Sequence, residues 1–284
     1  MAPLIACAQL TWKGVAEDTV LAEISSAGYD GAPAKYDRAA AETAAVFQRH
    51  GLKPAPGYYG ASFWKAEERE QIVAGARRAA KVMRELGCDQ LFVAASGEYI
   101  GAGGRTRRQV AGHVGAEDAL TDAEFSTFAE TLNAVGAATL AEGVSSCFHN
   151  HVGTVIETAA EFERLLAATD PNTVFLGPDT GHLAWGGADA AAFCTAHADR
   201  IRAVHLKDID EDVRRRGAAE EWDYRTFVEH GIFAELGEGS VDLPTVLATV
   251  AGLDWVIVET DVTQQPTALQ SATISRNHLR SLGW

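Results

Sequence analysis

The sequence predicts an α/β fold, a single (β/α)8 TIM barrel that spans residues 1–284, and three observations predict it. Short β-like runs alternate with longer helical segments along the whole chain. Several of these runs, such as LFVAA and WVIVE, are almost continuously apolar, as expected of parallel strands that are covered on both faces. No linker or change of composition divides the 284 residues, so one barrel accounts for the whole length.

Eight segments have the composition of barrel strands. In chain order they cover residues 4–9, 29–32, 52–56, 90–95, 144–149, 174–179, 201–207 and 255–260. Ala-rich amphipathic segments lie between them, and the clearest cover residues 65–87, 121–143 and 158–168. Thr121 with Glu124, and Thr158 with Glu161, have the spacing of a capping box, which marks the start of a helix. Gly143 stands where a glycine is expected after a helix.

Two connections are longer than the entry into a helix requires, and they lie near residues 96–120 and 208–240. Long loops in compact domains are often lids or binding loops, and in a barrel both would lie at the C-terminal face, where activity resides. The competing fold is a doubly wound sheet, which usually has a phosphate-binding turn after its first strand. That turn reads LTWKG here, and GAGGRT at 101–106 lacks the required glycine spacing, so the barrel is favoured.

The charge balance and the cysteines exclude several classes of function. The chain has 39 acidic and 24 basic residues and a formal net charge of -15, which repels nucleic acid and anionic membranes. Its four cysteines have no C-x-x-C spacing, so neither a thiolate zinc site nor a disulfide framework is expected. No apolar stretch reaches the ~20 residues that span a bilayer, and the start of the chain has no basic segment. We therefore expect a cytoplasmic protein with a small-molecule partner.

Polar side chains gather where the last four predicted strands end. In chain order they are His149, Asn150 and His151, then Asp179 and His182, then His205 and Lys207, and finally Glu259 and Asp261. In an eight-stranded barrel these groups would converge on one point at the C-terminal face. Imidazole and carboxylate groups without cysteine suit a divalent metal ion, with Mn as the first choice and Co, Mg or Zn as alternatives. Such an ion would act as a Lewis acid on a substrate oxygen.

Each of these residues also has a purely structural explanation. Asp179 can cap the helix that follows it, His205 can be a half-buried histidine with satisfied hydrogen bonds, and Lys207 can be a surface lysine. Glu259 is harder to explain in this way, because a buried carboxylate without a partner is costly and requires a cation. The charged stretches 208–212 and 214–216 have the composition of a solvated loop. The recurrence of polar groups at successive strand ends favours the metal site.

The motifs GPDTGH, VHLKD and VIVETD, together with the stretch 231–247, resemble the xylose-isomerase-like barrel superfamily of sugar isomerases and epimerases. Within it, the chain is similar to the inosose dehydratase branch and to enzymes that act on oxidised (keto) sugars or glycosides. The resemblance implies that Asp179, His205 and Glu259 are metal ligands. It also places four further side chains near the substrate or the metal: His151, His182, Lys207 and Glu238.

The sequence departs from the superfamily pattern at one position. Epimerases and isomerases of this group commonly carry glutamate, in an E-N-H pattern, where this chain has His149. They use two carboxylates on opposite faces of the substrate, one to remove a proton beside a carbonyl and one to return a proton. That pair is lost here, and the inosose dehydratase branch tolerates histidines in this stretch. The departure therefore favours a lyase.

We predict an enzyme, a divalent-metal-dependent lyase or dehydratase that removes a proton beside a carbonyl and eliminates the group β to it. The metal would bind Asp179, His205 and Glu259, and it remains open whether His149 is a fourth ligand. His149 or His151 would transfer the proton, because the ordinary pKa of an imidazole lies near neutrality.

The substrate would be a keto-inositol, which loses water, or a 3-keto-sugar or glycoside, which loses an alcohol or aglycone. Lys207 and His182 would orient or polarise its oxygen atoms. Aromatic residues after the first and third strands are candidates for a sugar-binding wall, with core packing as the alternative: Trp12, Tyr58, Tyr59, Phe63 and Trp64.

Two other functions remain open. One is a metal-dependent sugar isomerase or 3-epimerase in which His149 acts where glutamate usually does. The other is a non-catalytic sugar- or metal-binding barrel, or one subunit of a hetero-complex. We expect a homo-oligomer, with a small partner subunit as an open alternative.

Overall fold

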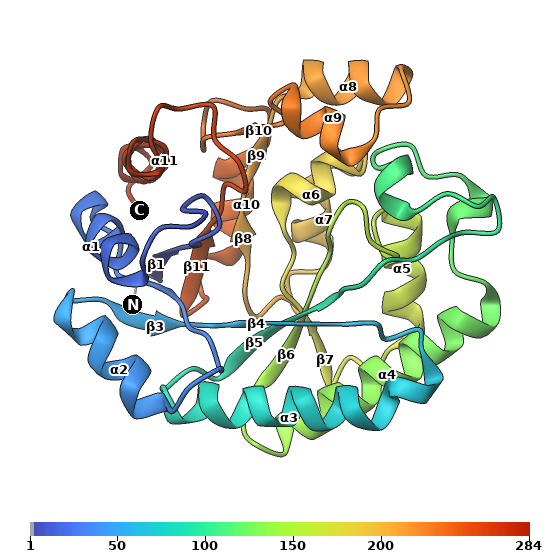
Figure 1. The fold of residues 1–284 in the computed structure, drawn as a ribbon, viewed down its shortest axis with the longest axis horizontal. Coiled ribbons are helices and arrows are strands. Elements are labelled where there is room, and N and C mark those ends of the chain that lie inside the picture. The colour runs from blue at the N-terminus through green and yellow to red at the C-terminus, as the bar shows by residue number, and fades with distance from the viewer. Residues whose placement is uncertain (1–2) are drawn as a thin grey trace.

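Parallel strands form the centre of the molecule and helices surround them in the computed structural model, which describes residues 3–284 (Figure 1). The strands of the barrel are β1 (Leu4–Cys7), β2 (Gly31–Pro33), β3 (Lys53–Ala55), β4 (Tyr58–Ala61), β5 (Gln90–Ala95), β6 (Ser145–His149), β7 (Val174–Leu176), β8 (His205–Leu206) and β11 (Trp255–Val258). They pair in the orders β3-β2-β1-β11-β8 and β4-β5-β6-β7. Parallel bridges from Leu176 to Ile201 and from Asp179 to His205 join β7 to the β8 segment. The predicted (β/α)8 barrel is confirmed.

The third predicted strand is split into two segments. β3 pairs with β2, β4 pairs with β5, and Pro56 and Gly57 lie between them. Pro56 has no N–H group to donate to a neighbouring strand. A Cβ atom at Gly57 would lie 2.4 Å from the carbonyl oxygen of Ala34, so the close approach of the chain requires glycine. The prediction ended this strand at residue 56 and missed β4, because a proline followed by glycine is typical of a turn.

Helices follow the barrel strands and cover their outer side (Figure 1). They are α1 (Glu17–Ala27), α2 (Ala40–Arg49), α3 (Arg69–Glu85), α4 (Asp122–Leu140), α5 (Ala159–Ala168), α7 (Ala190–Ala196), α10 (Leu243–Val250) and α11 (Ala268–Ser281). Both predicted capping boxes are confirmed, at the starts of α4 and α5. Phe148 of β6 packs against Phe128 of α4 and Phe162 of α5, which shows how the apolar strand faces bind the helices. Within residues 3–284, no helix has both the length and the apolar character needed to cross a membrane.

The two long connections start at the carboxyl ends of β5 and β8. The first contains the 3-10 turns η2 (Arg107–Val110) and η3 (Ala116–Asp118). The second contains β9 (Asp208–Ile209), α8 (Glu211–Ala219), α9 (Tyr224–Glu229) and β10 (Phe233–Ala234), with β9 and β10 antiparallel. Figure 1 shows α8 and α9 at the same end of the barrel as the short helix α6 (Thr180–Trp185). Contacts between α9 and η2 join the two connections.

The prediction of a solvated loop at residues 208–212 is wrong for Asp208. Its side chain is buried, and its carboxylate accepts hydrogen bonds from the backbone N–H groups of Ile209, Gly237, Gly239 and Val241. Several N–H donors stabilise a carboxylate away from water. Asp208 therefore holds the segment 237–241 against β9, and the stretch after it continues as helix α8.

Candidate metal centre and active site

The four predicted metal ligands lie at the carboxyl ends of neighbouring strands. His149 is the last residue of β6, Asp179 follows β7 and Glu259 follows β11. His205 lies in β8, which has only two residues, so it is also at the end of its strand. Parallel pairing places Asp179 opposite His205 and places His205 opposite Ile257, so these strand ends lie level with one another. All four side chains are buried, with at most 6% of a residue's surface exposed.

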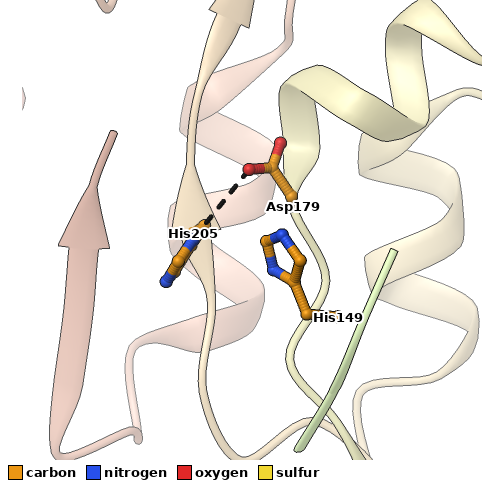
Figure 2. A group of neighbouring side chains, drawn as sticks. All are labelled: His149, Asp179 and His205. Carbon is orange, nitrogen blue, oxygen red and sulfur yellow. Dashed lines mark ion pairs between the residues drawn. The ribbon is translucent and has the colours of Figure 1, made fainter. Parts of the chain in front are cut away.

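The side chains of His149, Asp179 and His205 lie together (Figure 2). Each offers one atom that can bind a metal, and these three atoms lie within 4.8 Å of one another. Glu259 extends the group, because its Oε2 lies 3.1 Å from Nδ1 of His205. One cation placed among the first three atoms would contact side chains from three strand ends, with Glu259 beside His205.

Hydrogen bonding supports a cation in this position. Nδ1 of His149, Oδ2 of Asp179 and Nδ1 of His205 are buried and form no hydrogen bond among the described residues, but Oδ2 of Asp179 lies 3.1 Å from Nζ of Lys207 and Nδ1 of His205 lies 3.1 Å from Oε2 of Glu259. Of the three atoms, Nδ1 of His149 is therefore the one with neither a hydrogen bond nor an ion pair in the described part of the chain. Buried polar atoms without a partner are rare and costly, and they commonly mark an ion or water site. Two imidazoles with carboxylates are a donor set that suits Mn²⁺, Co²⁺ or Zn²⁺. The residues therefore fit a divalent metal ion.

The structural explanation for Asp179 is also correct. Its Oδ1 accepts a hydrogen bond of 2.8 Å from the backbone N–H of His182 and so caps helix α6. The carboxylate has two oxygens, and the cap uses one of them. The other, Oδ2, remains directed at the cluster of ligand atoms.

Lys207 is not the surface lysine that we considered, because its side chain is fully buried. Its Nζ donates to Glu259 Oε1 at 2.8 Å, to Asp261 Oδ1 at 2.8 Å and to His182 Nε2 at 3.0 Å. Asp179 Oδ2 also lies at ion-pair distance, 3.1 Å from Nζ. Burial lowers the pKa of Lys207, but the three carboxylates outweigh it and hold that pKa well above its ordinary value. Lys207 is therefore a buried ammonium ion with all three N–H groups in use.

A second group of side chains lies on the other side of Lys207. His151, His182 and Asp261 also offer atoms within 4.8 Å of one another, and the two imidazole rings lie 3.7 Å apart between centroids. His182 is fully buried and contacts Lys207, whereas His151 is only partly buried. Nδ1 of His151 lies 2.7 Å from the carbonyl oxygen of Val152. Because a carbonyl only accepts, Nδ1 carries the hydrogen and Nε2 keeps a free lone pair.

Two cavities meet beside these residues. The larger, of about 560 Å³, is lined by His149, His205 and Glu259, and the smaller, of about 380 Å³, lies beside the loop after β5. His151 and Tyr58 line both cavities. The Tyr58 ring also meets the His149 ring edge to face, at 5.2 Å between centroids. Tyr58 is therefore the predicted aromatic residue that the structure brings to the site.

The structure does not bring the two predicted tryptophans to these cavities. Trp12 is buried in the core and donates its indole N–H to Glu23, at 2.6 Å. Trp64 is also buried and packs edge to face against Tyr99, at 5.9 Å. Among the described residues, neither tryptophan lines either cavity, because burial of a large apolar ring in the core is favourable. Glu238 is exposed to solvent, whereas the metal ligands are buried.

Sequence reasoning missed two residues that cover the site. Tyr224 of α9 lies parallel to the His151 ring, at 6.1 Å between centroids and 19° between planes. The guanidinium group of Arg108, in η2, lies 4.3 Å from the centroid of the Tyr224 ring, which is a cation–π contact. The two long connections therefore meet over His151. Their length was the sequence signal, but nothing in the sequence indicated which side chains would meet.

Glu157 connects the same region to the barrel. Its carboxylate is buried and accepts hydrogen bonds of 2.7 Å from the N–H groups of Gly112 and Gly153. Arg107 lies 3.8 Å away. Burial raises the pKa of Glu157 to about 7, although Arg107 and the two N–H groups act in the opposite direction. The loop after β5 is thus held to the segment after β6 by a carboxyl group that protonates near neutrality.

We expect the stability of the fold to depend on pH through Glu157. Its pKa in the folded protein lies above the ordinary 4.5, so its contribution is fully present below pH 4.5 and is lost as the pH rises through about 7. The expected loss is about 3 kcal/mol. Urea unfolding from about pH 4.5 to about pH 8 should therefore show a smaller loss for Glu157→Gln than for the wild type. Glu67→Gln, at an exposed position, is the control, and identical profiles for Glu157→Gln and wild type would contradict the prediction.

An eight-stranded parallel barrel with imidazole, carboxylate and ammonium groups gathered at the carboxyl ends of its strands is the architecture of a TIM-barrel enzyme. The family model of the xylose isomerase-like TIM barrel matches residues 21–282, and the chain belongs to this family. The resemblance seen in the strand-end motifs is therefore confirmed.

Three similar proteins illustrate the range of the family. The chain is 30% identical over 265 residues to an inosose dehydratase of Geobacillus kaustophilus (strain HTA426), which covers 92% of this chain and 84% of that protein. The 3-keto-D-glucoside 4-epimerase YcjR of E. coli has a TM-score of 0.70 at 17% identity, over 98% of this chain and 99% of that one. The probable 3-DHS dehydratase AsbF of Bacillus anthracis has a TM-score of 0.70 at 13% identity, over 99% of both chains. The last two likenesses show the shared fold.

Proposed function

We propose that the chain is a divalent-metal-dependent lyase, a dehydratase or related eliminating enzyme that acts on a keto-inositol or a 3-keto-sugar derivative. The observation that carries this proposal is His149, whose Nδ1 has no hydrogen-bond partner in the described part of the chain and lies with Asp179 and His205. A histidine here removes one carboxylate of the pair that the family's epimerases use. The 30% identity with an inosose dehydratase, over 92% of this chain, also supports a lyase rather than an epimerase.

In this proposal His149, Asp179, His205 and Glu259 hold the metal, with manganese as the first choice. When bound, the ion supplies Lewis acidity that stabilises negative charge on the oxygen of the substrate ketone. The unpartnered Nδ1 of His149 favours the role of ligand over that of proton carrier.

His151 is then the proton-transfer residue. It lines both cavities, and the hydrogen on Nδ1 leaves the lone pair of Nε2 free to accept a proton. His151 takes the proton of the C–H bond beside the carbonyl, and the electron pair of that bond forms a C=C double bond conjugated with the carbonyl. The bond to the β group breaks, and that group leaves with its bonding electron pair and with the proton that His151 returns. Tyr224 stacks on the His151 ring and holds its orientation.

Lys207 acts on the reaction as a positioning residue. Its three N–H groups are used by Glu259, Asp261 and His182, so none remains free for the substrate. Its positive charge lowers the pKa of both neighbouring carboxylates: burial still raises the pKa of Asp179 to about 6, whereas the pKa of Glu259 lies well below its ordinary value. His182 is fully buried and accepts a hydrogen bond from Nζ of Lys207, which helps to hold the ammonium group in position.

The reaction in deuterated water tests the proposal. The Mn²⁺-loaded protein is incubated separately with a keto-inositol and with a 3-keto-glucoside, and the products are followed by proton NMR and by the absorbance of a conjugated carbonyl. We expect loss of water from the first or of the alcohol from the second. Reversible deuterium incorporation into an otherwise intact sugar, without elimination, would establish the epimerase alternative instead.

A further inference from the structure

Exposed apolar side chains are concentrated at the mouth of the larger cavity. Within residues 3–284, five large apolar side chains are exposed, and three of them, Leu10, Tyr36 and Tyr58, line this cavity. Leu10 is 52% exposed, Tyr36 38% and Tyr58 40%. Single exposed apolar residues are ordinary on a protein surface, whereas a group of them around one cavity indicates a binding site.

The walls of this cavity are mostly apolar, and two exposed residues of its lining, Lys35 and Asp37, are charged. Pro33, Ala34 and Pro56 continue the apolar surface inward from the rim. The side-chain amide of Gln9, which also lines the cavity, already donates to the carbonyl oxygen of Pro33 at 2.9 Å. The floor is formed by metal ligands, among them His149 and Glu259. Whatever fills the cavity therefore touches an apolar wall at one end and the reacting centre at the other.

The smaller cavity has a mixed lining that is more polar than that of the larger one. It lies on the other side of Tyr58 and His151, and its lining includes the side chains of Ser96, Glu98, Thr106, Arg108 and Thr154. Hydroxyl groups of a polyol can form hydrogen bonds there. Hydroxyl groups placed against the apolar wall would lose their bonds to water without replacement, which is costly.

We infer that the substrate carries an apolar group, such as an aryl ring, beside its keto ring, and that Leu10, Tyr36 and Tyr58 bind this group. The inference rests on the proposed function and narrows its substrate class to glycosides with an apolar aglycone. A bare keto-inositol has a hydroxyl group on nearly every carbon and would leave the apolar wall in contact with water. A partner protein resting on the rim would not fill a cavity that reaches the metal ligands.

Binding of unreactive glycosides tests the inference without turnover. Phenyl β-D-glucoside and methyl β-D-glucoside both lack a ketone, so neither can undergo the elimination. Their dissociation constants for the Mn²⁺-loaded protein are measured by calorimetry, with myo-inositol as a third ligand. We expect the phenyl glucoside to bind about tenfold more tightly than the other two, from the area of the buried ring. Equal affinities for the phenyl and methyl glucosides would overturn the inference.

Two matched variants locate the binding surface. Leu10 and Val15 are both exposed, at 52% and 44%, but Val15 is not part of the lining of either cavity in the described structure. We expect Leu10→Asn to reduce the preference for the phenyl glucoside about fivefold and Val15→Asn to leave it unchanged. An unchanged preference in Leu10→Asn would overturn the inference. A sedimentation mass of Leu10→Asn that differs from that of the wild type would also overturn it, because it would show the rim to be an interface between protein chains.

The outcomes separate this inference from the proposed function. A phenyl preference that depends on Leu10, without elimination from any keto substrate, would support the binding site and contradict the lyase. Elimination of water from a bare keto-inositol, without a phenyl preference, would support the lyase and overturn the inference.

Discussion

Replacement of Lys207 by methionine is expected to lower the free energy of unfolding of the metal-free protein by about 3–5 kcal/mol. The ammonium group lies within 3.1 Å of carboxylate oxygens of Asp179, Glu259 and Asp261, and its side chain is fully buried. Its removal leaves three carboxylates without their cation, and two of them, Asp179 and Glu259, are buried. Methionine retains an unbranched side chain in place of the lysine stem, which packs closely against Gly181. Urea unfolding in the presence of a chelator measures the loss.

Lys65 provides the matched control. It pairs with Glu68 at 3.0 Å, but both side chains are about 40% exposed, and such surface pairs contribute about 1 kcal/mol or less. Lys65→Met should therefore change the free energy of unfolding little. Added Mn²⁺ should stabilise Lys207→Met more than the wild type, because a cation at the ligand atoms again compensates Asp179 and Glu259. If both lysine variants lost the same stability, Lys207 would not be the counter-ion of these carboxylates.

Replacement of His149 by glutamate is expected to reduce elimination at least about 100-fold while metal binding is retained. Glutamate restores the carboxylate that the epimerases of the family carry at this position. The new carboxylate would lie beside Asp179, His205 and Glu259, where it can bind the metal ion. It would also make the surroundings of the reacting carbon more negative than they are with a neutral imidazole. We also expect proton exchange at the carbon beside the carbonyl to appear or to increase. Metal content and the deuterium experiment described above give both readouts.

His149→Gln separates the charge of this residue from its ability to bind metal. Glutamine is neutral and is a weaker ligand than imidazole or carboxylate, so metal content should fall, whereas His149→Glu should keep it. Elimination at the wild-type rate by His149→Glu would contradict the assignment of His149 as the residue that distinguishes the lyase from an epimerase. If His149→Glu lost its metal and His149→Gln kept it, His149 would not be a metal ligand.

Most of the fold could be predicted because its signals are local. Strands such as β5 and β11 are nearly continuous apolar runs, and the helices after β5 and β6 begin with capping boxes that the structure confirms. The interruption at Pro56 and Gly57 could not be predicted, because the same pair ends a strand in most contexts. Only the neighbouring β5, which pairs with the chain after the interruption, makes β4 a strand.

The candidate site shows the same division. Asp179, His205 and Glu259 could be predicted as neighbours, because the carboxyl ends of parallel strands lie at one face of a barrel. The burial of Lys207 could not be predicted. The cost of burying its ammonium group is offset by the carboxylates of Asp179, Glu259 and Asp261, which are all more than 25 residues away in the sequence. Trp12 and Trp64 followed strands as predicted but turned into the core.

The sequence by itself determined the barrel, the order of its strands and the chemistry available at their ends, because these follow from hydrophobic periodicity, helix caps and residue types. The tertiary structure alone decided which side chains touch. It placed Nδ1 of His149, without a hydrogen bond, beside Asp179 and His205, and it placed His151 where two cavities meet and Leu10 at an apolar rim. Contacts between residues distant in sequence depend on how loops and strands pack in space, and no local pattern records that packing.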